Sequence, residues 1–446
     1  MGRIMKKILL LFFTTALILN GVAAEPLQLE FWGNTDKPSI SYKTGEKIRF
    51  TLELLHKGEG TVSPDWVVKW SCRGDDGKAE LKGTLPVAKM PHTIETTLDK
   101  PGFIWVTAQL YDKNGKPVLT PKGKRKIPVE YTGGAGAAID QIKAVPEPGD
   151  FDEFWKGMKK ELASVPLRVI EKKQIQDNGI CDIYAMKIAC AGSRPVTGYL
   201  TVPKGAKAKS MPVRAEFYGY SWRKIPVPKK TSADRITFYV SAHGVELGQN
   251  KAYYDKFFND LKSNGHTQGL DPEDNRKPGK SFLSFMSLRV MRAMEYLKTL
   301  PEWDGKTLEA NGGSQGGLQS VWAASLVPGV SRINVSIIWC CDLGGATVYG
   351  RLCAPVSKGP SQTVPWRMAY VPELGYFDAV NHAKRIPESC YVNIITAGLG
   401  DYISPPSGLA LFYKNVRGKA LLRYLQNAGH VTRSSIRKGK VFELKK

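Results

Sequence analysis

Residues 311–317 read Asn-Gly-Gly-Ser-Gln-Gly-Gly, a stretch that contains the pattern Gly-x-Ser-x-Gly. This pattern is typical of a nucleophile elbow, in which a serine occupies a tight turn between a strand and a helix. A short strand-like segment, 307–311, precedes the pattern, and a helical pattern follows at 317–326. Glycine is expected at both flanks because a side chain there would clash inside the turn. The stretch therefore predicts a strand–turn–helix unit that raises the Ser314 hydroxyl above a sheet.

The same turn predicts where a developing negative charge would be stabilised. The backbone N–H of Gln315 and the start of the helix face whatever the hydroxyl attacks, and these donors suit an oxyanion. A second donor is expected from a loop that follows an early strand. The backbone N–H of Tyr220, just after the predicted strand 212–218, fits that position. The alternatives are a glycine-rich turn that merely packs and, around Tyr220, an aromatic turn that only packs.

A serine nucleophile also needs a histidine base within hydrogen-bond reach. Only His382 and His430 lie downstream of the elbow, where this class of fold places its base. His382 falls inside a predicted helix, 377–385, which favours a packing or surface role. His430 follows Gly429 near the chain end, in a predicted loop. We therefore predict His430 as the base.

Three downstream aspartates compete to orient that histidine. Asp401 follows the strand-like segment 391–397, and two prolines just beyond it stiffen the loop that would hold its carboxylate. Asp378 lies at the start of a predicted helix, where capping suffices as an explanation. Asp342 follows the earlier strand 333–338 and is the fallback. We predict Asp401 as the acid.

The chain has 446 residues, enough for two or three domains, and it begins with a segment that is not part of the fold. Basic residues at positions 3, 6 and 7 precede a mostly apolar run at 8–19 and small residues up to Ala24. Residues 1–24 are predicted to be a signal peptide, cleaved near Ala24 in an exported protein. No later stretch approaches the ~20 apolar residues of a spanning helix, so no membrane span is expected.

The formal net charge is +23, and the seven cysteines follow no regular spacing. A solvated lysine surface is the simplest explanation of the charge. In an exported protein no nucleic-acid partner is expected, and an acidic polysaccharide is a better candidate. The odd, sparse cysteines match neither a disulfide framework nor a zinc site, although one or two bridges stay open. No motif requires a cofactor or a metal.

Residues 25–131 carry alternating patterns typical of β-strands. The predicted strands are 27–32, 47–55, 66–72, 93–98, 102–111 and 126–131. This many short strands suggests an immunoglobulin-like sandwich. Its tryptophans could stack on sugars, but a core role is the simpler interpretation; they are Trp32, Trp66, Trp70 and Trp105. A run of small residues, 132–138, opens a predicted linker, 132–149.

Residues 150–446 alternate strands with helices, which predicts an α/β-hydrolase domain with a mostly parallel sheet covered on both faces. The stretch 148–155 is expected to begin a helix that runs to about Ser164, and a second, long helix is expected at 281–300. Further strands are expected at 181–189, 197–202 and 212–218, and the two predicted strands beyond the elbow continue the sheet. In such a domain the loops at the carboxyl ends of the strands carry the reactive residues.

Residues 145–432 resemble the acetyl xylan esterase / cephalosporin C deacetylase family. The motifs that carry the resemblance are Asp150–Trp155, Gly219-Tyr220, Gly312–Gly317, Tyr376–Asn381, Asp401 with Pro405–Ser407, and Gly429-His430. The chain departs from the family at 241–248 and at 338–342, at Ser404, where relatives often have cysteine, and at Val431, where relatives have an acid.

The resemblance implies Ser314 as nucleophile, His430 as base and Asp401 as acid, with oxyanion donors on the backbones of Tyr220 and Gln315. It implies removal of acetyl groups from sugars through an acyl-enzyme, without metal. It also implies a homo-oligomer, since the family forms compact rings. The alternatives are a broader esterase or serine peptidase on the same scaffold, and a glycan-binding protein whose hydrolase domain is inactive.

Overall fold

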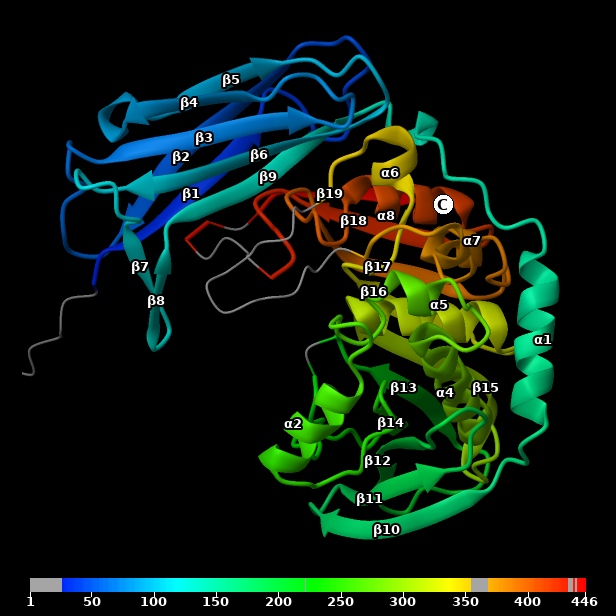
Figure 1. The fold of residues 1–446 in the computed structure, drawn as a ribbon. Coiled ribbons are helices and arrows are strands. Elements are labelled where there is room, and N and C mark those ends of the chain that lie inside the picture. The colour runs from blue at the N-terminus through cyan, green and yellow to red at the C-terminus, as the bar shows by residue number, and fades with distance from the viewer. Residues whose placement is uncertain (1–25, 221, 354–367, 432–435, 438) are drawn as a thin grey trace, which may run out of the picture.

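The computed structural model describes residues 26–220, 222–353, 368–431, 436–437 and 439–446. An all-β region comes first, and an α/β domain follows it (Figure 1). The predicted signal peptide, residues 1–24, lies outside the described residues.

Residues 26–137 fold into two antiparallel sheets that pack face to face, and a two-stranded hairpin, β7 (Leu119–Lys122) with β8 (Arg125–Pro128), extends from them. One sheet has the order β1 (Gln28–Thr35), β2 (Ile48–Lys57), β5 (His92–Thr96). The other has the order β4 (Leu81–Pro86), β3 (Val67–Gly74), β6 (Gly102–Tyr111), β9 (Glu130–Ala137). Alternate residues such as Phe50, Val68 and Val106 point inward and form one buried core. The sandwich agrees with the strand pattern, and its immunoglobulin-like class stays a prediction.

The sequence analysis predicted a linker that opens with the small-residue run 132–138. This prediction is wrong for the run, because most of it belongs to β9. This strand pairs with β6 along its whole length. A Cβ built on Gly134 would lie 2.2 Å from the carbonyl oxygen of Ile104 and 2.9 Å from that of Leu399. A Cβ on Gly400 would lie 2.4 Å from the carbonyl carbon of Thr132. The small residues are thus explained by a close approach between β9 and a turn of the second domain.

The predicted tryptophans and cysteines take mostly structural positions. Trp32 is buried, and Trp66 and Trp70 pack against the sandwich core. Trp105 stacks on Tyr402 of the second domain. All seven cysteines lie among the described residues and none forms a disulfide.

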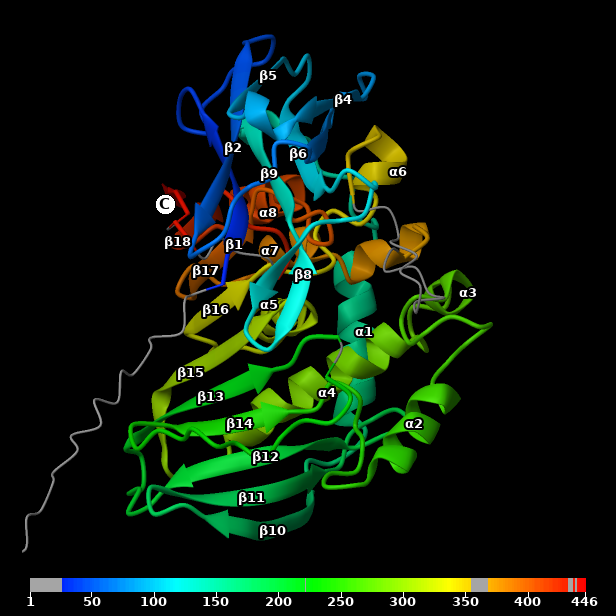
Figure 2. The same ribbon diagram turned by 90° about the vertical axis from the view of Figure 1, so that its left-hand side faces the viewer.

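In the described part of the second domain, ten strands form one sheet (Figure 2). Its strands, in spatial order, are β10 (Val169–Asp177), β11 (Cys181–Ile188), β12 (Val196–Pro203), β14 (Ile236–Val240), β13 (Met211–Phe217), β15 (Trp303–Gly313), β16 (Arg332–Ser336), β17 (Tyr391–Gly398), β18 (Ala420–Leu425) and β19 (Val441–Lys445). The centre, from β14 to β18, is parallel, and both ends are antiparallel. The parallel centre confirms the predicted α/β-hydrolase class.

The main helices form one layer against one face of this sheet (Figures 1 and 2). They are α1 (Phe151–Ala163), α4 (Phe282–Leu297), α5 (Gln315–Leu326), α7 (Ala379–Ala383) and α8 (Pro406–Asn415). The helices α2 (Lys251–Asp260), α3 (Pro272–Asn275) and α6 (Gly345–Tyr349) lie in the connections between strands. Helix α4 is buried on almost every side, which explains its lack of a polar face. None of the helices in the described residues has the length and apolar character needed to cross a membrane.

The prediction of helices on both faces is wrong for the strands from β13 to β19, within the described residues. There the second face carries polar side chains that bond to one another across the strands. Asn311 donates to Glu216 at 2.9 Å, Asn334 donates to Asn311 at 3.0 Å, and Asn393 donates to Asn334 at 2.9 Å. Arg423 continues the row by donating to Asn393 at 3.0 Å. A hydrogen-bonded polar face satisfies itself and does not require a second layer of helices.

Candidate active site

The predicted elbow forms between β15 and α5. Ser314 has φ 56° and ψ −122°, a strained conformation that such turns impose on the serine. A Cβ on Gly312 would lie 2.4 Å from the backbone of Gly316, and a Cβ on Gly316 would lie 2.1 Å from the carbonyl oxygen of Phe217. Backbone therefore occupies the space on both flanks, and only glycine fits there.

The structure brings together the three residues that the sequence analysis selected. The Ser314 hydroxyl lies 3.0 Å from Nε2 of His430, and Nδ1 of His430 lies 2.9 Å from a carboxylate oxygen of Asp401. The Asp401 side chain is fully buried. Since a carboxylate only accepts hydrogen bonds, Nδ1 carries the proton and Nε2 is left to accept from the serine.

The loop that carries Asp401 is fixed by further hydrogen bonds. The second carboxylate oxygen of Asp401 accepts from the backbone N–H groups of Ile403, at 3.0 Å, and Ser404, at 2.9 Å. The Ser404 hydroxyl donates to the carbonyl oxygen of Ile337 at 2.9 Å. Ser404, which departs from the family pattern, thus connects the acid loop to the segment after β16.

That segment also holds the elbow. The backbone N–H of Ser314 donates to the carbonyl oxygen of Ser336 at 3.0 Å, and the N–H of Trp339 donates to the carbonyl oxygen of Ser314 at 3.1 Å. Ile337 between them has a positive φ of 42°, an uncommon conformation for a β-branched residue. Nucleophile and acid loop are therefore both bonded to residues 336–339.

The two predicted oxyanion donors lie beside the serine. Gln315 is the first residue of α5, so its N–H is at the helix N-terminus, and its side chain is buried. A Cβ built on Gly219 would lie 3.9 Å from Cβ of Ser314, which brings the Gly219–Tyr220 backbone against the nucleophile. The Tyr220 side chain turns away and donates to Thr267 at 2.7 Å.

The residues that the sequence analysis ranked lower have other partners. Asp342 forms a two-pronged ion pair with Arg351, with both hydrogen bonds at 2.8 Å, and burial raises the pKa of Asp342 to about 7. Asp378 caps α7 by accepting from Val380 at 2.9 Å. His382 lies between Ser325 and the carbonyl oxygen of Tyr376, and burial lowers its pKa to about 3. The structure therefore confirms the capping role of Asp378 and the packing role of His382.

The sequence analysis missed the contacts between the sandwich and the loops of the site. Thr132 of β9 accepts from the indole N–H of Trp105 at 2.8 Å and donates to the carbonyl oxygen of Gly400 at 2.7 Å. Gly400 directly precedes Asp401. On the base side, Asn427 accepts from the backbone N–H of Gly33 at 2.7 Å. Loops of both the acid and the base are thus held by the sandwich. The only signal was the small-residue run of β9.

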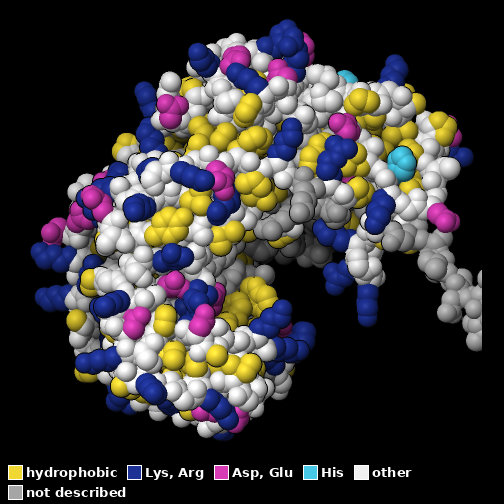
Figure 3. Space-filling model, turned by 180° about the vertical axis from the view of Figure 1, so that it is seen from behind, with side chains coloured by type: hydrophobic (Ala, Val, Ile, Leu, Met, Phe, Trp, Pro, Cys, Tyr) yellow, Lys and Arg dark blue, Asp and Glu magenta, His cyan; other side chains and the backbone are white. Residues whose placement is uncertain are grey.

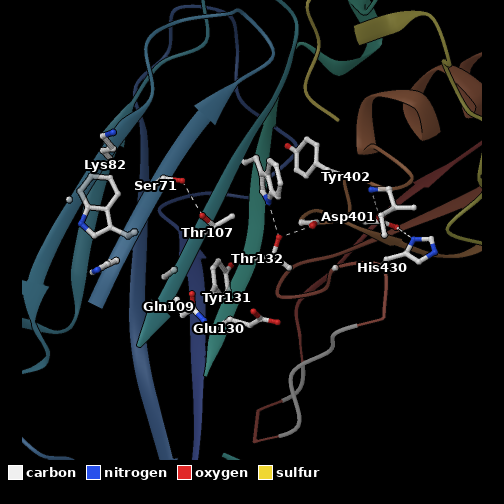
Figure 4. Close-up of a pocket in the computed structure, with 18 of the residues that line it drawn as sticks. Ser71, Lys82, Thr107, Gln109, Glu130, Tyr131, Thr132, Asp401, Tyr402 and His430 are labelled. Atoms are coloured by element: carbon white, nitrogen blue, oxygen red, sulfur yellow. Dashed lines mark hydrogen bonds and ion pairs between the residues drawn. The ribbon is translucent and has the colours of Figure 1, made fainter. Parts of the chain in front are cut away.

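A cavity of about 880 Å³ lies between the sandwich and these loops. Residues 400–403 and 429–431 form one wall, and side chains from β3, β4, β6 and β9 form the other (Figure 4). The space-filling view shows a broad hollow between the two regions (Figure 3). His430 therefore faces a space much larger than its own loop encloses.

A serine, histidine and aspartate in hydrogen-bond contact above a parallel sheet define an α/β-hydrolase site. The family model for acetyl xylan esterase (AXE1) matches residues 140–446. The chain belongs to this family and is a carboxylic ester hydrolase. The match begins after β9, so the sandwich lies outside it.

Individual relatives agree with this family. The acetyl esterase Axe7A of Xylanibacter ruminicola is 28% identical over 398 residues, which cover 82% of this chain and 79% of that protein. An acetyl xylan esterase from a Paenibacillus species has a similar fold, with a TM-score of 0.51 and 21% identity over 66% of this chain and 92% of that one. Acetyl xylan esterase 1 from a Thermoanaerobacterium species has a TM-score of 0.50 and 21% identity over 67% and 94%.

Proposed function

We propose that this protein is an exported carbohydrate esterase that removes acetyl groups from poly- or oligosaccharides, with Ser314 as nucleophile, His430 as base and Asp401 as acid. The observation that carries the proposal is the unbroken hydrogen-bonded chain from the Ser314 hydroxyl through His430 to the buried Asp401. This is the geometry that lets a serine lose its proton as it attacks a carbonyl carbon.

In the first half of the reaction, Nε2 of His430 takes the hydroxyl proton while the Ser314 oxygen bonds to the acetyl carbon. The carbonyl oxygen becomes an oxyanion, which accepts from the backbone N–H groups of Gln315 and Tyr220. The buried Asp401 stabilises the imidazolium and keeps its orientation. When the intermediate collapses, the bond to the sugar oxygen breaks, and that oxygen takes the proton from His430.

In the second half a water molecule attacks the acetyl-Ser314 ester. His430 takes a proton from the water, and the same backbone donors stabilise the second oxyanion. Collapse releases acetic acid, which ionises, and returns the proton to the Ser314 oxygen. Each bond made and broken is accounted for by these residues and water.

The names of the relatives support an acetyl ester as the substrate, since Axe7A is an acetyl esterase and the two similar structures are acetyl xylan esterases. The predicted signal peptide supports export. For the assembly we propose a homo-oligomer, as the family resemblance implies, which sedimentation of the purified mature chain would test.

Acetate release from acetylated oligosaccharides and from nitrophenyl acyl esters tests the proposal. Ser314→Ala should abolish turnover of every ester, whereas Ser164→Ala, at the end of α1, should retain the full rate. A pure Ser314→Ala protein that stays active would refute the assignment of the nucleophile. If activity were confined to long acyl chains or aminoacyl-anilides, the roles of Ser314, His430 and Asp401 would stand. The enzyme would then be a broader esterase or a peptidase and not a deacetylase.

A further inference from the structure

The cavity beside His430 has one wall that the ester chemistry does not use. This wall is the outer face of the sheet β4-β3-β6-β9 (Figure 4). The cavity volume of about 880 Å³ is at the upper end of ligand pockets, far above what an acetyl group fills. Two of its other lining residues, Asp401 and His430, belong to the site itself. A ligand in the cavity would therefore lie against His430, the residue whose Nε2 contacts the Ser314 hydroxyl.

The side chains of this wall form ordered rows because the strands pair in register. Lys69 of β3 lies opposite Gln109 of β6, and Gln109 lies opposite Glu130 of β9. The next row has Ser71 opposite Thr107, which lie 3.0 Å apart and share a hydrogen bond. These groups are amides, hydroxyls and charged ends, the side chains that donate to and accept from sugar hydroxyls.

The outer face of the other sheet of the sandwich offers a direct contrast. There Arg49 of β2 lies opposite Glu95 of β5, and they pair at 2.9 Å, so their charges neutralise each other. On the cavity wall Lys69, Lys82 and Glu130 are exposed, and no ion pair of theirs is found within the described residues. Lys69 lies over the Tyr111 ring at 4.6 Å, and Gln109 accepts from the Tyr111 hydroxyl at 2.6 Å, so this wall holds its amide and ammonium groups in place without neutralising their charge.

The wall extends away from the reacting atoms. Strand β9 is closest to the second domain, and β4 is the far edge, so three strand spacings of ~4.8 Å separate the rows at the two edges. Lys82 of β4 lies at the end remote from His430, with Thr107 and Thr132 between them (Figure 4). A ligand held at His430 and also at Lys82 must be extended by more than ~14 Å.

We propose that this face of the sandwich is a binding surface for the glycan chain, which holds the sugar residues that follow the acetylated one. The inference rests on the proposed function, and it specifies the substrate class as an acetylated oligo- or polysaccharide of several residues. An acetylated monosaccharide would reach the nucleophile but leave the wall empty. The sandwich thereby determines chain-length preference, while the second domain performs the hydrolysis.

The test compares kcat/KM for nitrophenyl acetate, acetylated xylose and acetylated xylo-oligosaccharides of increasing length. For the natural chain, kcat/KM should rise with length. The double variant Lys69→Ala with Gln109→Ala should lose about tenfold on the longest substrates through KM, as expected for the loss of one or two hydrogen bonds. Its loss on acetylated xylose should be below about twofold.

The matched control is Arg49→Ala with Glu95→Ala, a cross-strand pair on the other outer face. This variant should keep the whole length dependence. A natural chain with no length dependence, or a Lys69/Gln109 variant that retains it, would overturn the inference while the proposed function stands. Hydrolysis of nitrophenyl acetate with no release of acetate from any sugar would instead refute the proposed function. The inference on the glycan surface would then be refuted as well.

Discussion

The two walls of the cavity differ in how they are built. In the wall formed by loops 400–403 and 429–431, hydrogen bonds hold the reactive side chains, and both carboxylate oxygens of Asp401 have partners. The sandwich wall consists of strand side chains that repeat at fixed spacing, and its charged ends, Lys69, Lys82 and Glu130, are exposed. Chemistry on an ester requires a few atoms held to fractions of an ångström, whereas contact with a chain requires spaced groups that adapt.

The largest effect is expected for Asp401→Asn. The backbone N–H groups of Ile403 and Ser404 would hold the amide oxygen, so the amide NH2 would face Nδ1 of His430 and donate to it. The imidazole then takes the wrong tautomer, and kcat should fall by about 10⁴. The loss should be equal for nitrophenyl acetate and for long oligosaccharides, because the catalytic wall acts on every ester. Steady-state rates on both substrates measure it.

Asp342→Asn is the control for that prediction, because Asp342 pairs with Arg351 and not with His430. This variant should keep kcat within about tenfold at a temperature where it is folded. A larger loss of kcat in Asp342→Asn than in Asp401→Asn would mean that Asp342 is the acid.

The next largest effect is expected for Gly316→Ala in the elbow. Its Cβ would lie 2.1 Å from the carbonyl oxygen of Phe217, and backbone must move to relieve the clash. We expect a loss of about 1–3 kcal/mol in the free energy of unfolding, together with a displaced nucleophile. Gly313→Ala is the matched control, since its nearest contact would be at 3.8 Å. Equal melting temperatures for the two variants would contradict the packing argument.

The sequence was sufficient to predict the catalytic wall. Gly-x-Ser-x-Gly fixes a backbone conformation, and the order of strands and loops leaves few histidines and aspartates to complete the site. Ser314, His430 and Asp401 were selected in this way, and the structure brings them together. Their roles follow from local geometry, which short motifs encode well.

The sequence was insufficient for the relation between the two regions. The small residues of β9 looked like a flexible linker, because composition cannot distinguish flexibility from close backbone packing. The polar second face of the large sheet was visible as alternation, with Glu309 and Asn311 beside buried Ala310. That pattern was overlooked because α/β-hydrolase sheets are expected to be covered. The contact of Thr132 with Gly400 joins residues 268 positions apart and has no local signal.

That contact leads to a prediction on the boundary between the two walls. Thr132→Val removes the acceptor for Trp105 and the donor for Gly400, at a cost of about 1 kcal/mol. Because Gly400 precedes Asp401, we expect kcat to fall about threefold to tenfold on short and long substrates alike. A loss confined to long substrates would place Thr132 with the glycan surface instead. Lys69→Ala with Gln109→Ala provides the comparison.

The smallest effect is expected at Asp75, where sandwich and second domain meet away from the cavity. Asp75 accepts from the backbone N–H groups of Phe103 and Leu352, both at 2.9 Å, and burial raises its pKa to about 6. A raised carboxyl pKa means that the folded state binds more protons than the unfolded state between pH ~4 and ~6. The stability contribution of this group therefore falls as pH rises through that window.

Asp75→Asn removes this titration, so stability relative to the natural chain should increase as pH rises from ~4 to ~6. The variant should also be less stable near pH ~4, because the amide offers one acceptor where the carboxyl offers two. Denaturant unfolding at several pH values measures both, and kcat/KM at neutral pH should not change. A change in chain-length preference would contradict the assignment of this preference to the sandwich wall of the cavity. It would mean that a contact outside the cavity alters that wall.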